Sequence, residues 1–510
     1  MSNCYQVSII NQKRIIYFNQ LSIIMKKSIK LIALFVVFQL SALSTFAQDK
    51  AQQIEQLLAK YNEYGQFNGS ALVAVNGKVI LKKGFGLANM EWNVPNQFDT
   101  KFRLGSISKQ FTALLIVKLA EEGKLKLDVP ITTYLPDYPK QNGDKITIHH
   151  LLTHTSGIPN YTNAPNFFKD KARNPYTPEE FVKTFSSLPL EFTPGEKFNY
   201  SNSGYFLLGY IIEKISGKTY EQYLQEIIFT PLKMVNSGYD HSDVILKNRA
   251  AGYEKQGKKI VNAPYLDMSI PYAAGSLYST VEDLYLWDQA LYTNKLLSEK
   301  SIESLYKPYI KAWGGFYGYG WSTYEAPNGQ NSKLNIIEHG GGINGFNTVI
   351  SRIPADKNLV VLLNNTGGTV LGEMNTAIRA ILYNQPFDQP KKSLALDLLD
   401  IYNEKGAATG TETYKKLKND PSYAIKEGDM NRVGYQLLQN GKKKEAIEVF
   451  KINVETFPKS GNAFDSLGEA YLADGDKKLA IANYKKSVEL DPSNENGKKV
   501  LDELLKSKTK

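Results

Sequence analysis

The stretch RLGSISKQFTALL, Arg103–Leu115, passes from a loop into an apolar helix and carries Ser106 three residues before Lys109. Residues i and i+3 share one face of a helix, so the hydroxyl and the amine are expected to touch. A serine becomes a nucleophile when a base takes its proton, and a lysine can be that base when burial and the positive helix end lower its pKa. The alternative is a helix-capping serine beside a solvated lysine, since the short pattern is common.

A second stretch, FNYSNSGY, places Tyr200 and Asn202 in a loop before the predicted helix Ser203–Ile215. A tyrosine beside a cationic lysine can act as a phenolate, or it can relay a proton between the nucleophile and the leaving group. An asparagine amide can donate to a substrate carbonyl. The alternatives are a tyrosine of the core and an asparagine of a turn.

A third stretch, IIEHGGGINGF, places His339 at a strand end, directly before Gly340, Gly341 and Gly342. Glycines let a backbone approach a substrate closely, and their N–H groups can bind an oxyanion. Taken alone, the run could also be a glycine turn.

In this order, the three stretches resemble the motifs of the serine β-lactamase and penicillin-binding superfamily. The likeness is to the branch of class C β-lactamases, D-alanyl-D-alanine carboxypeptidases, D-aminopeptidases and esterases, and it covers about residues 51–384. The resemblance implies an acyl-enzyme formed by a catalytic set: Ser106, Lys109, Tyr200 and His339. It implies a substrate-binding set: Asn202, Gly341 and Gly342. The N–H groups of Ser106 and Gly342 would form the oxyanion hole, His339 would line the site opposite Lys109, and no cofactor or metal would be needed.

The third motif departs from the lactamase pattern, because many β-lactamases carry a lysine where this chain has His339. Histidine is mostly neutral at pH 7, so it binds a substrate carboxylate less well than a permanent cation. We therefore expect a peptidase, amidase or esterase acting on a small molecule or peptide. The alternatives are a β-lactamase and a penicillin-binding sensor with slow or no turnover that signals through its C-terminal tail.

Three other histidines, His149, His150 and His154, lie close together in IHHLLTHTSG, and a spacing of four on a helix could bind zinc. No acidic or cysteine ligand is nearby in the sequence, so we expect no metal. The resemblance implies that this stretch supports the site from behind.

The pattern of strands and helices predicts an α+β fold over residues 48–390. One hairpin turns at Asn76-Gly77 and a second turns at Pro354–Asn358, with helices between them. Strands at both ends of the region are expected to pair in one antiparallel sheet. The resemblance implies a five-stranded sheet flanked by helices, an all-helical region, and the site between them. Loops at Asn160–Pro175 and Lys307–Lys333 are expected around the site.

The C-terminal region is helical and repeats with a period of 34 residues, so that Gly434 corresponds to Gly468 and Phe450 to Tyr484. This pattern resembles tetratricopeptide repeats. We expect the repeats and a capping helix over residues 430–507, after a linker or degenerate repeat at 391–429. Such a tail offers a concave surface to a protein or peptide partner, or it packs on the catalytic domain and stabilises it.

Residues 1–47 are expected to be a signal-peptide region with its true start at Met25. Lysines precede the apolar run Leu31–Leu43, and small residues before Gln48 fit a cleavage site. The mature protein would be periplasmic or secreted, with no stable membrane span. Since Cys4 is the only cysteine, a disulfide or thiol nucleophile is excluded in the mature chain. The net charge of +10 includes five basic residues of this segment, and no basic block suited to nucleic acid follows it.

Overall fold

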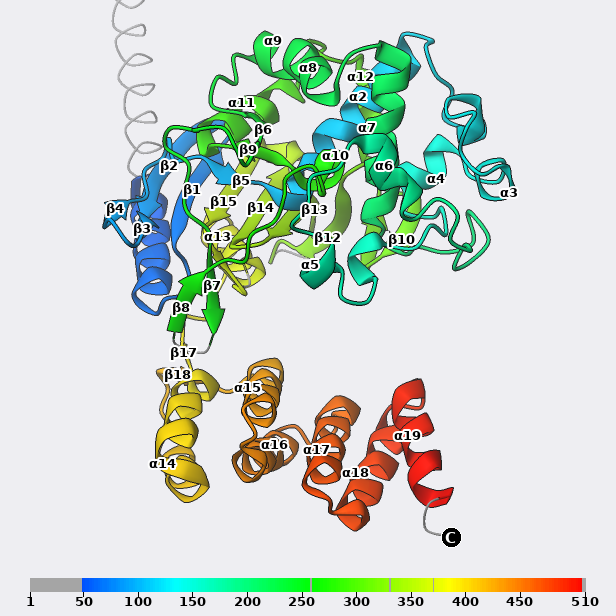
Figure 1. Ribbon diagram of the computed structural model, residues 1–510. Coiled ribbons are helices and arrows are strands. Elements are labelled where there is room, and N and C mark those ends of the chain that lie inside the picture. The colour runs from blue at the N-terminus through cyan, green and yellow to red at the C-terminus, as the bar shows by residue number, and fades with distance from the viewer. Residues whose placement is uncertain (1–47, 257–258, 330–331, 370, 507–510) are drawn as a thin grey trace, which may run out of the picture.

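The computed structural model describes residues 48–256, 259–329, 332–369 and 371–506 (Figure 1). The expected signal-peptide region lies outside the described residues. The α+β domain that the sequence predicts to be catalytic, called the catalytic domain below, comes first in the chain, and a row of helices follows it. No helix within the described ranges is long and apolar enough to cross a bilayer.

The catalytic domain is built on one antiparallel sheet in the order β10-β11-β12-β13-β14-β15-β1-β2. The bounds of its strands are β10 Ile310–Ala312, β11 Gly315–Tyr317, β12 Ser322–Pro327, β13 Lys333–Ile343, β14 Phe346–Ile353, β15 Asn358–Asn364, β1 Gly69–Val75 and β2 Lys78–Phe85. Strand β1, near the start of the domain, pairs with β15, near its end, from Gly69↔Asn364 to Ala74↔Leu359. The α+β class and the antiparallel pairing of the two ends of the domain are therefore confirmed.

The expected number of five strands is wrong, because the main sheet has eight strands within the described ranges. The additional strands β10, β11 and β12 extend the sheet beyond β13 and come from the segment 307–333, which we expected to be a loop. Two of them have only three residues each, Ile-Lys-Ala in β10 and Gly-Phe-Tyr in β11. Runs this short show no readable alternation of apolar and polar residues, and they become strands by pairing with an existing edge.

Helices cover both faces of the sheet, and alternate residues of β1 serve the two resulting cores. Leu72 and Ala74 face a core that includes residues of α2 (Ser108–Glu121), α7 (Asn202–Ser216) and α11 (Val281–Ala290). Ala71 and Val73 face a second core formed with the helix at residues 48–63 and α13 (Gly372–Leu382). Helix α2 is buried on nearly all sides, and its buried residues include the polar Ser108, Lys109, Gln110 and Thr112.

The tail is a row of helices that runs across below the catalytic domain in Figure 1. Its helices are α14 Leu394–Leu417, which breaks at Gly406, α15 Glu427–Gln439, α16 Lys443–Thr456, α17 Gly461–Asp474, α18 Lys477–Leu490 and α19 Glu495–Lys506. The period of 34 residues reflects one repeated contact. A Cβ at Gly434 would lie 2.4 Å from the ring of Phe450, and one at Gly468 would lie 3.1 Å from Tyr484. Glycine thus lets each pair of helices pack closely.

The near end of the tail contacts the catalytic domain at its surface. Lys426 forms an ion pair with Glu373 of α13 at 2.5 Å, and the Gln66 amide donates to the Lys391 carbonyl at 2.7 Å. Helices α17 to α19 lie farther away in Figure 1.

Candidate active site

Ser106 lies in a single 3₁₀ turn, Gly105–Ile107, directly before α2. No side chain caps α2, so the Ser106 hydroxyl is not a helix cap. Instead its Oγ lies 3.0 Å from Lys109 Nζ. The turn also depends on Gly105, which has φ of +56°, and a Cβ there would lie 2.9 Å from Gly342 N. Only glycine allows this turn to approach β13 so closely.

Lys109 is fully buried, and its Nζ forms hydrogen bonds with three neutral oxygens. Besides Ser106 Oγ, Nζ lies 2.8 Å from Asn202 Oδ1 and 2.8 Å from the Ala274 carbonyl. A neutral amine has two donors and one lone pair. When it donates to the amide oxygen and the carbonyl, its lone pair is left for the Ser106 proton.

Burial holds the pKa of Lys109 well below its usual range. Removing an ammonium from water disfavours its charged form, and the neutral oxygens around this amine supply no negative charge to compensate. The geometry and the electrostatics therefore both suit a lysine that accepts a proton.

The Tyr200 ring lies beside this pair, with Lys109 Nζ 4.9 Å from its centroid. Burial raises the pKa of Tyr200 above its usual range, and a hydrogen bond with Ser106 offsets only part of that rise. Tyr200 is therefore a neutral phenol at pH 7, which favours the proton relay over the phenolate.

His339 is set back from the nucleophile, and both of its ring nitrogens are engaged. Nδ1 lies 2.6 Å from the Gly340 carbonyl, so it carries the proton, and Nε2 lies 2.9 Å from the Tyr317 hydroxyl. Burial, with a smaller effect from Lys109, lowers the pKa of His339 to about 4. The ring is therefore neutral at pH 7 and holds no charge for a substrate carboxylate.

A hydrogen-bonded chain with one possible direction connects His339 to His154. His154 Nδ1 accepts from the Ser201 N–H at 3.1 Å, so its proton is on Nε2, which donates to the Tyr317 hydroxyl at 3.3 Å. Tyr317 then donates to His339. The His154 ring packs against Tyr200, with ring centroids 4.1 Å apart. Sequence reasoning missed Tyr317 because it lies in the segment expected to be a loop.

The histidines considered as possible zinc ligands form hydrogen bonds with protein groups. His149 Nδ1 pairs with the Tyr319 hydroxyl at 2.8 Å, and His150 Nδ1 accepts from Thr147 N at 3.2 Å. Across the described ranges, no group of three or more His, Cys, Asp or Glu residues could hold a metal ion.

The glycines after His339 lie on an open edge of β13. The neighbouring strand β12 pairs with β13 only as far as Ser322↔Glu338, so the backbone beyond that point is free of a strand on this side. A Cβ at Gly341 would lie 2.0 Å from the Leu104 carbonyl, which is a clash with backbone. Gly342 lines the cleft beside Ser106, where an N–H can meet a substrate oxygen.

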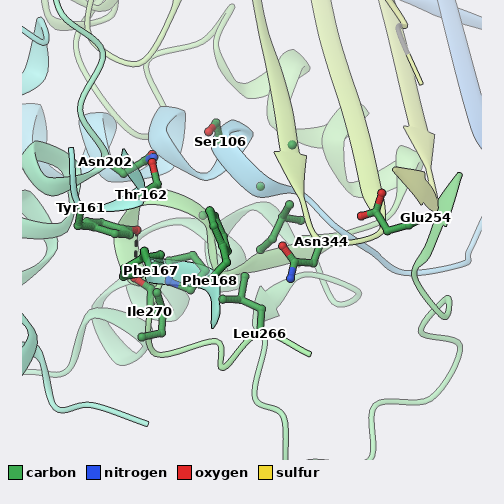
Figure 2. Close-up of a pocket in the computed structure, with 16 residues that line it drawn as sticks. Ser106, Tyr161, Thr162, Phe167, Phe168, Asn202, Glu254, Leu266, Ile270 and Asn344 are labelled. Atoms are coloured by element: carbon green, nitrogen blue, oxygen red, sulfur yellow. Dashed lines mark hydrogen bonds between the residues drawn. The ribbon is translucent and has the colours of Figure 1, made fainter. Parts of the chain in front are cut away.

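A cleft of about 320 Å³ opens beside Ser106, Asn202 and Gly342. Figure 2 shows Ser106 above the cleft, the rings of Phe167 and Phe168 below it, and Glu254 to one side. Apolar side chains dominate the lining: Phe167, Phe168, Leu266, Ile270, Pro271 and Ile343. No lysine or arginine of the described chain lines this cleft.

The antiparallel sheet, the serine beside the buried Lys109 and the glycine edge fit a serine hydrolase. The chain belongs to the β-lactamase family, since the family model described as Beta-lactamase matches residues 52–383. A model described as Tetratricopeptide repeat matches residues 462–494 and confirms the nature of the tail.

Similar proteins come from several organisms. The chain is 34% identical over 337 residues to a Bacillus subtilis protein named penicillin-binding protein PbpX, which covers 66% of this chain and 80% of that protein. A solved octameric penicillin-binding protein homologue from Pyrococcus abyssi is 33% identical, with a TM-score of 0.58 over 66% of this chain and 77% of that chain. A D-amino acid amidase from Ochrobactrum anthropi SV3 is 25% identical, with a TM-score of 0.57 over 66% and 99%.

Proposed function

We propose that this chain hydrolyses amides or esters through an acyl-enzyme on Ser106, as a peptidase, amidase or esterase related to the D-alanyl-D-alanine peptidases. The observation that carries the proposal is the position of Lys109 Nζ, 3.0 Å from Ser106 Oγ in a fully buried environment. A lysine held there in its neutral form can take the serine proton at neutral pH.

In the first step, Ser106 Oγ forms a bond to the acyl carbon while its proton passes to Lys109. The N–H groups of Ser106 and Gly342 bind the developing oxyanion. The bond between the acyl carbon and the leaving group then breaks, and Tyr200 passes the proton to the leaving nitrogen or oxygen. Water attacks the ester on Ser106 in the second step, gives one proton back through the same groups, and releases the acid.

The cleft favours substrates without a carboxylate next to the reacting bond. Its lining carries no cation within the described chain, and the neutral His339 supplies none. Asn202 uses Oδ1 to accept from Lys109, which leaves its amide N–H groups for a substrate carbonyl. The apolar lining suits an uncharged acyl group. The relative named as a D-amino acid amidase supports this substrate class over a β-lactam.

The two ends of the chain carry proposals of their own. Residues 1–47 are proposed to direct export, so that N-terminal sequencing of the mature protein should begin near Gln48. The tetratricopeptide tail is proposed to bind a protein or peptide partner, because α17 to α19 lie apart from the catalytic domain in Figure 1.

Ser106→Ala tests the proposed function against a panel of short-chain esters, D-amino-acid amides, D-Ala-D-Ala peptides and a cephalosporin. The substitution should lower kcat by about a thousandfold or more on every substrate that the wild type hydrolyses. A fluorophosphonate should label the wild type and not the variant. Undiminished turnover by Ser106→Ala would overturn the proposal.

A further inference from the structure

A tryptophan stands at an unexpected position in the hairpin beside the active site. The turn between β10 and β11 consists of Trp313 and Gly314, with φ of +48° and +81°. Two positive φ values define the tight hairpin turn that asparagine, aspartate and glycine adopt readily. Tryptophan has a Cβ and a bulky ring, so its backbone is strained there.

Strain of this kind gathers around the proposed nucleophile. Among the described non-glycine residues with positive φ, the aromatic ones are His154, Tyr272 and Trp313. His154 packs on Tyr200, and Tyr272 begins the short helix α10 (Tyr272–Gly275), which supplies the Ala274 carbonyl to Lys109. Backbone strain persists where surrounding contacts hold it, and it clusters at functional sites.

The Trp313 ring lies against the site and is also open to solvent. Its centroid is 5.0 Å from Phe198, 5.6 Å from Tyr200 and 6.0 Å from Tyr317. The side chain is nevertheless 66% exposed. One part of the indole thus packs on the aromatic cluster around Tyr200, and the remainder forms an apolar wall that no described residue covers.

This wall is separate from the lining of the cleft. The cleft is lined by Ser106, Asn202 and Gly342, whereas neither Tyr200 nor Trp313 belongs to its lining. In the proposed mechanism Tyr200 protonates the leaving group, so the leaving group must lie within hydrogen-bonding reach of the phenol. A group placed there lies next to the indole, while the acyl part occupies the cleft.

We propose that Trp313 forms a leaving-group subsite that stacks on an uncharged aromatic ring of the departing alcohol or amine. The inference rests on the proposed function and names one part of its substrate. A flat ring suits an exposed indole face flanked by Phe198.

The test compares benzyl acetate with ethyl acetate, which share one acyl group and differ in the ring of the leaving alcohol. Trp313→Asn places a residue suited to the turn and removes the indole, so the hairpin should be kept. It should lower kcat/KM for the benzyl ester about threefold to tenfold more than for the ethyl ester. Trp313→Phe, which keeps an aromatic ring, should retain most of the wild-type preference for the benzyl ester. Trp92→Asn is the matched control, because Trp92 is 79% exposed and lacks positive φ.

Each outcome has a distinct meaning. Equal losses on both esters in Trp313→Asn, in a variant whose Ser106 still reacts with a fluorophosphonate as fast as the wild type, would overturn the inference and leave the proposed function intact. The inference would also be overturned if Trp92→Asn lowered the preference for benzyl acetate over ethyl acetate as much as Trp313→Asn does. A wild-type Ser106 that neither reacts with the probe nor hydrolyses any ester would overturn the proposed function itself.

Discussion

Tyr317→Phe is expected to disrupt the hydrogen-bonded chain behind Tyr200 while keeping the aromatic packing. The change removes one buried hydroxyl, which accepts from His154 Nε2 at 3.3 Å and donates to His339 Nε2 at 2.9 Å. Each buried group left without a partner costs about 1–3 kcal/mol. Two groups lose a partner, and one of the bonds is long, so the free energy of unfolding should fall by about 2–4 kcal/mol.

Activity should fall with stability, and mainly through kcat. His154 packs on Tyr200 at 4.1 Å, so a looser His154 lets the phenol move relative to Ser106. We expect kcat to fall by about tenfold with a smaller change in KM, because the acyl cleft is untouched. Denaturant unfolding and steady-state kinetics on one ester measure the two effects.

The matched control is Tyr319→Phe, in the strand-connecting segment that follows β11. Its hydroxyl pairs with His149 Nδ1 at 2.8 Å and is not part of the chain behind Tyr200. This variant should lose about 1 kcal/mol of stability and keep the wild-type kcat. A Tyr317→Phe protein as stable and as active as the wild type would refute the reasoning.

Further predictions concern the base, the glycine edge and acid stability. Lys109→Met should lower the rate of fluorophosphonate labelling by about a hundredfold or more, measured by gel fluorescence. Gly341→Ala should abolish activity or folding, since its Cβ would lie 2.0 Å from the Leu104 carbonyl, whereas Gly340→Ala has 3.7 Å to its nearest neighbour and should fold in a thermal melt. The pKa of His339 is lowered from 6.5 to about 4, so the unfolded state binds a proton first as pH falls. Stability should therefore decrease from pH 6.5 towards pH 4 in denaturant titrations, and His339→Gln should flatten that decrease.

Local signals in the sequence predicted local structure well. Ser106 and Lys109 touch because the spacing of three residues fixes their relation on any helix. The Asn76-Gly77 turn has positive φ at both residues, as its composition requires. The signals from strand patterns at both ends of the domain also predicted their pairing, since two antiparallel hairpins with apolar faces must share a core.

Contacts between distant segments could not be predicted in the same way. His154 and Ser201 are brought together by tertiary packing, and nothing local marks the pair. The strands β10 to β12 form because the β13 edge offers unpaired backbone, which three-residue segments do not indicate by themselves. Trp313 contradicts the turn rule that worked at Asn76-Gly77, and local rules are expected to fail at functional sites.

The activation of Ser106 by an uncharged Lys109 is tested most directly by the pH dependence of fluorophosphonate labelling, with the modified residue mapped by mass spectrometry. We expect one adduct, on Ser106, whose rate of formation rises with pH through a midpoint well below 10.5, the ordinary pKa of lysine. An adduct on a different residue, or a midpoint at or above that ordinary value, would contradict it.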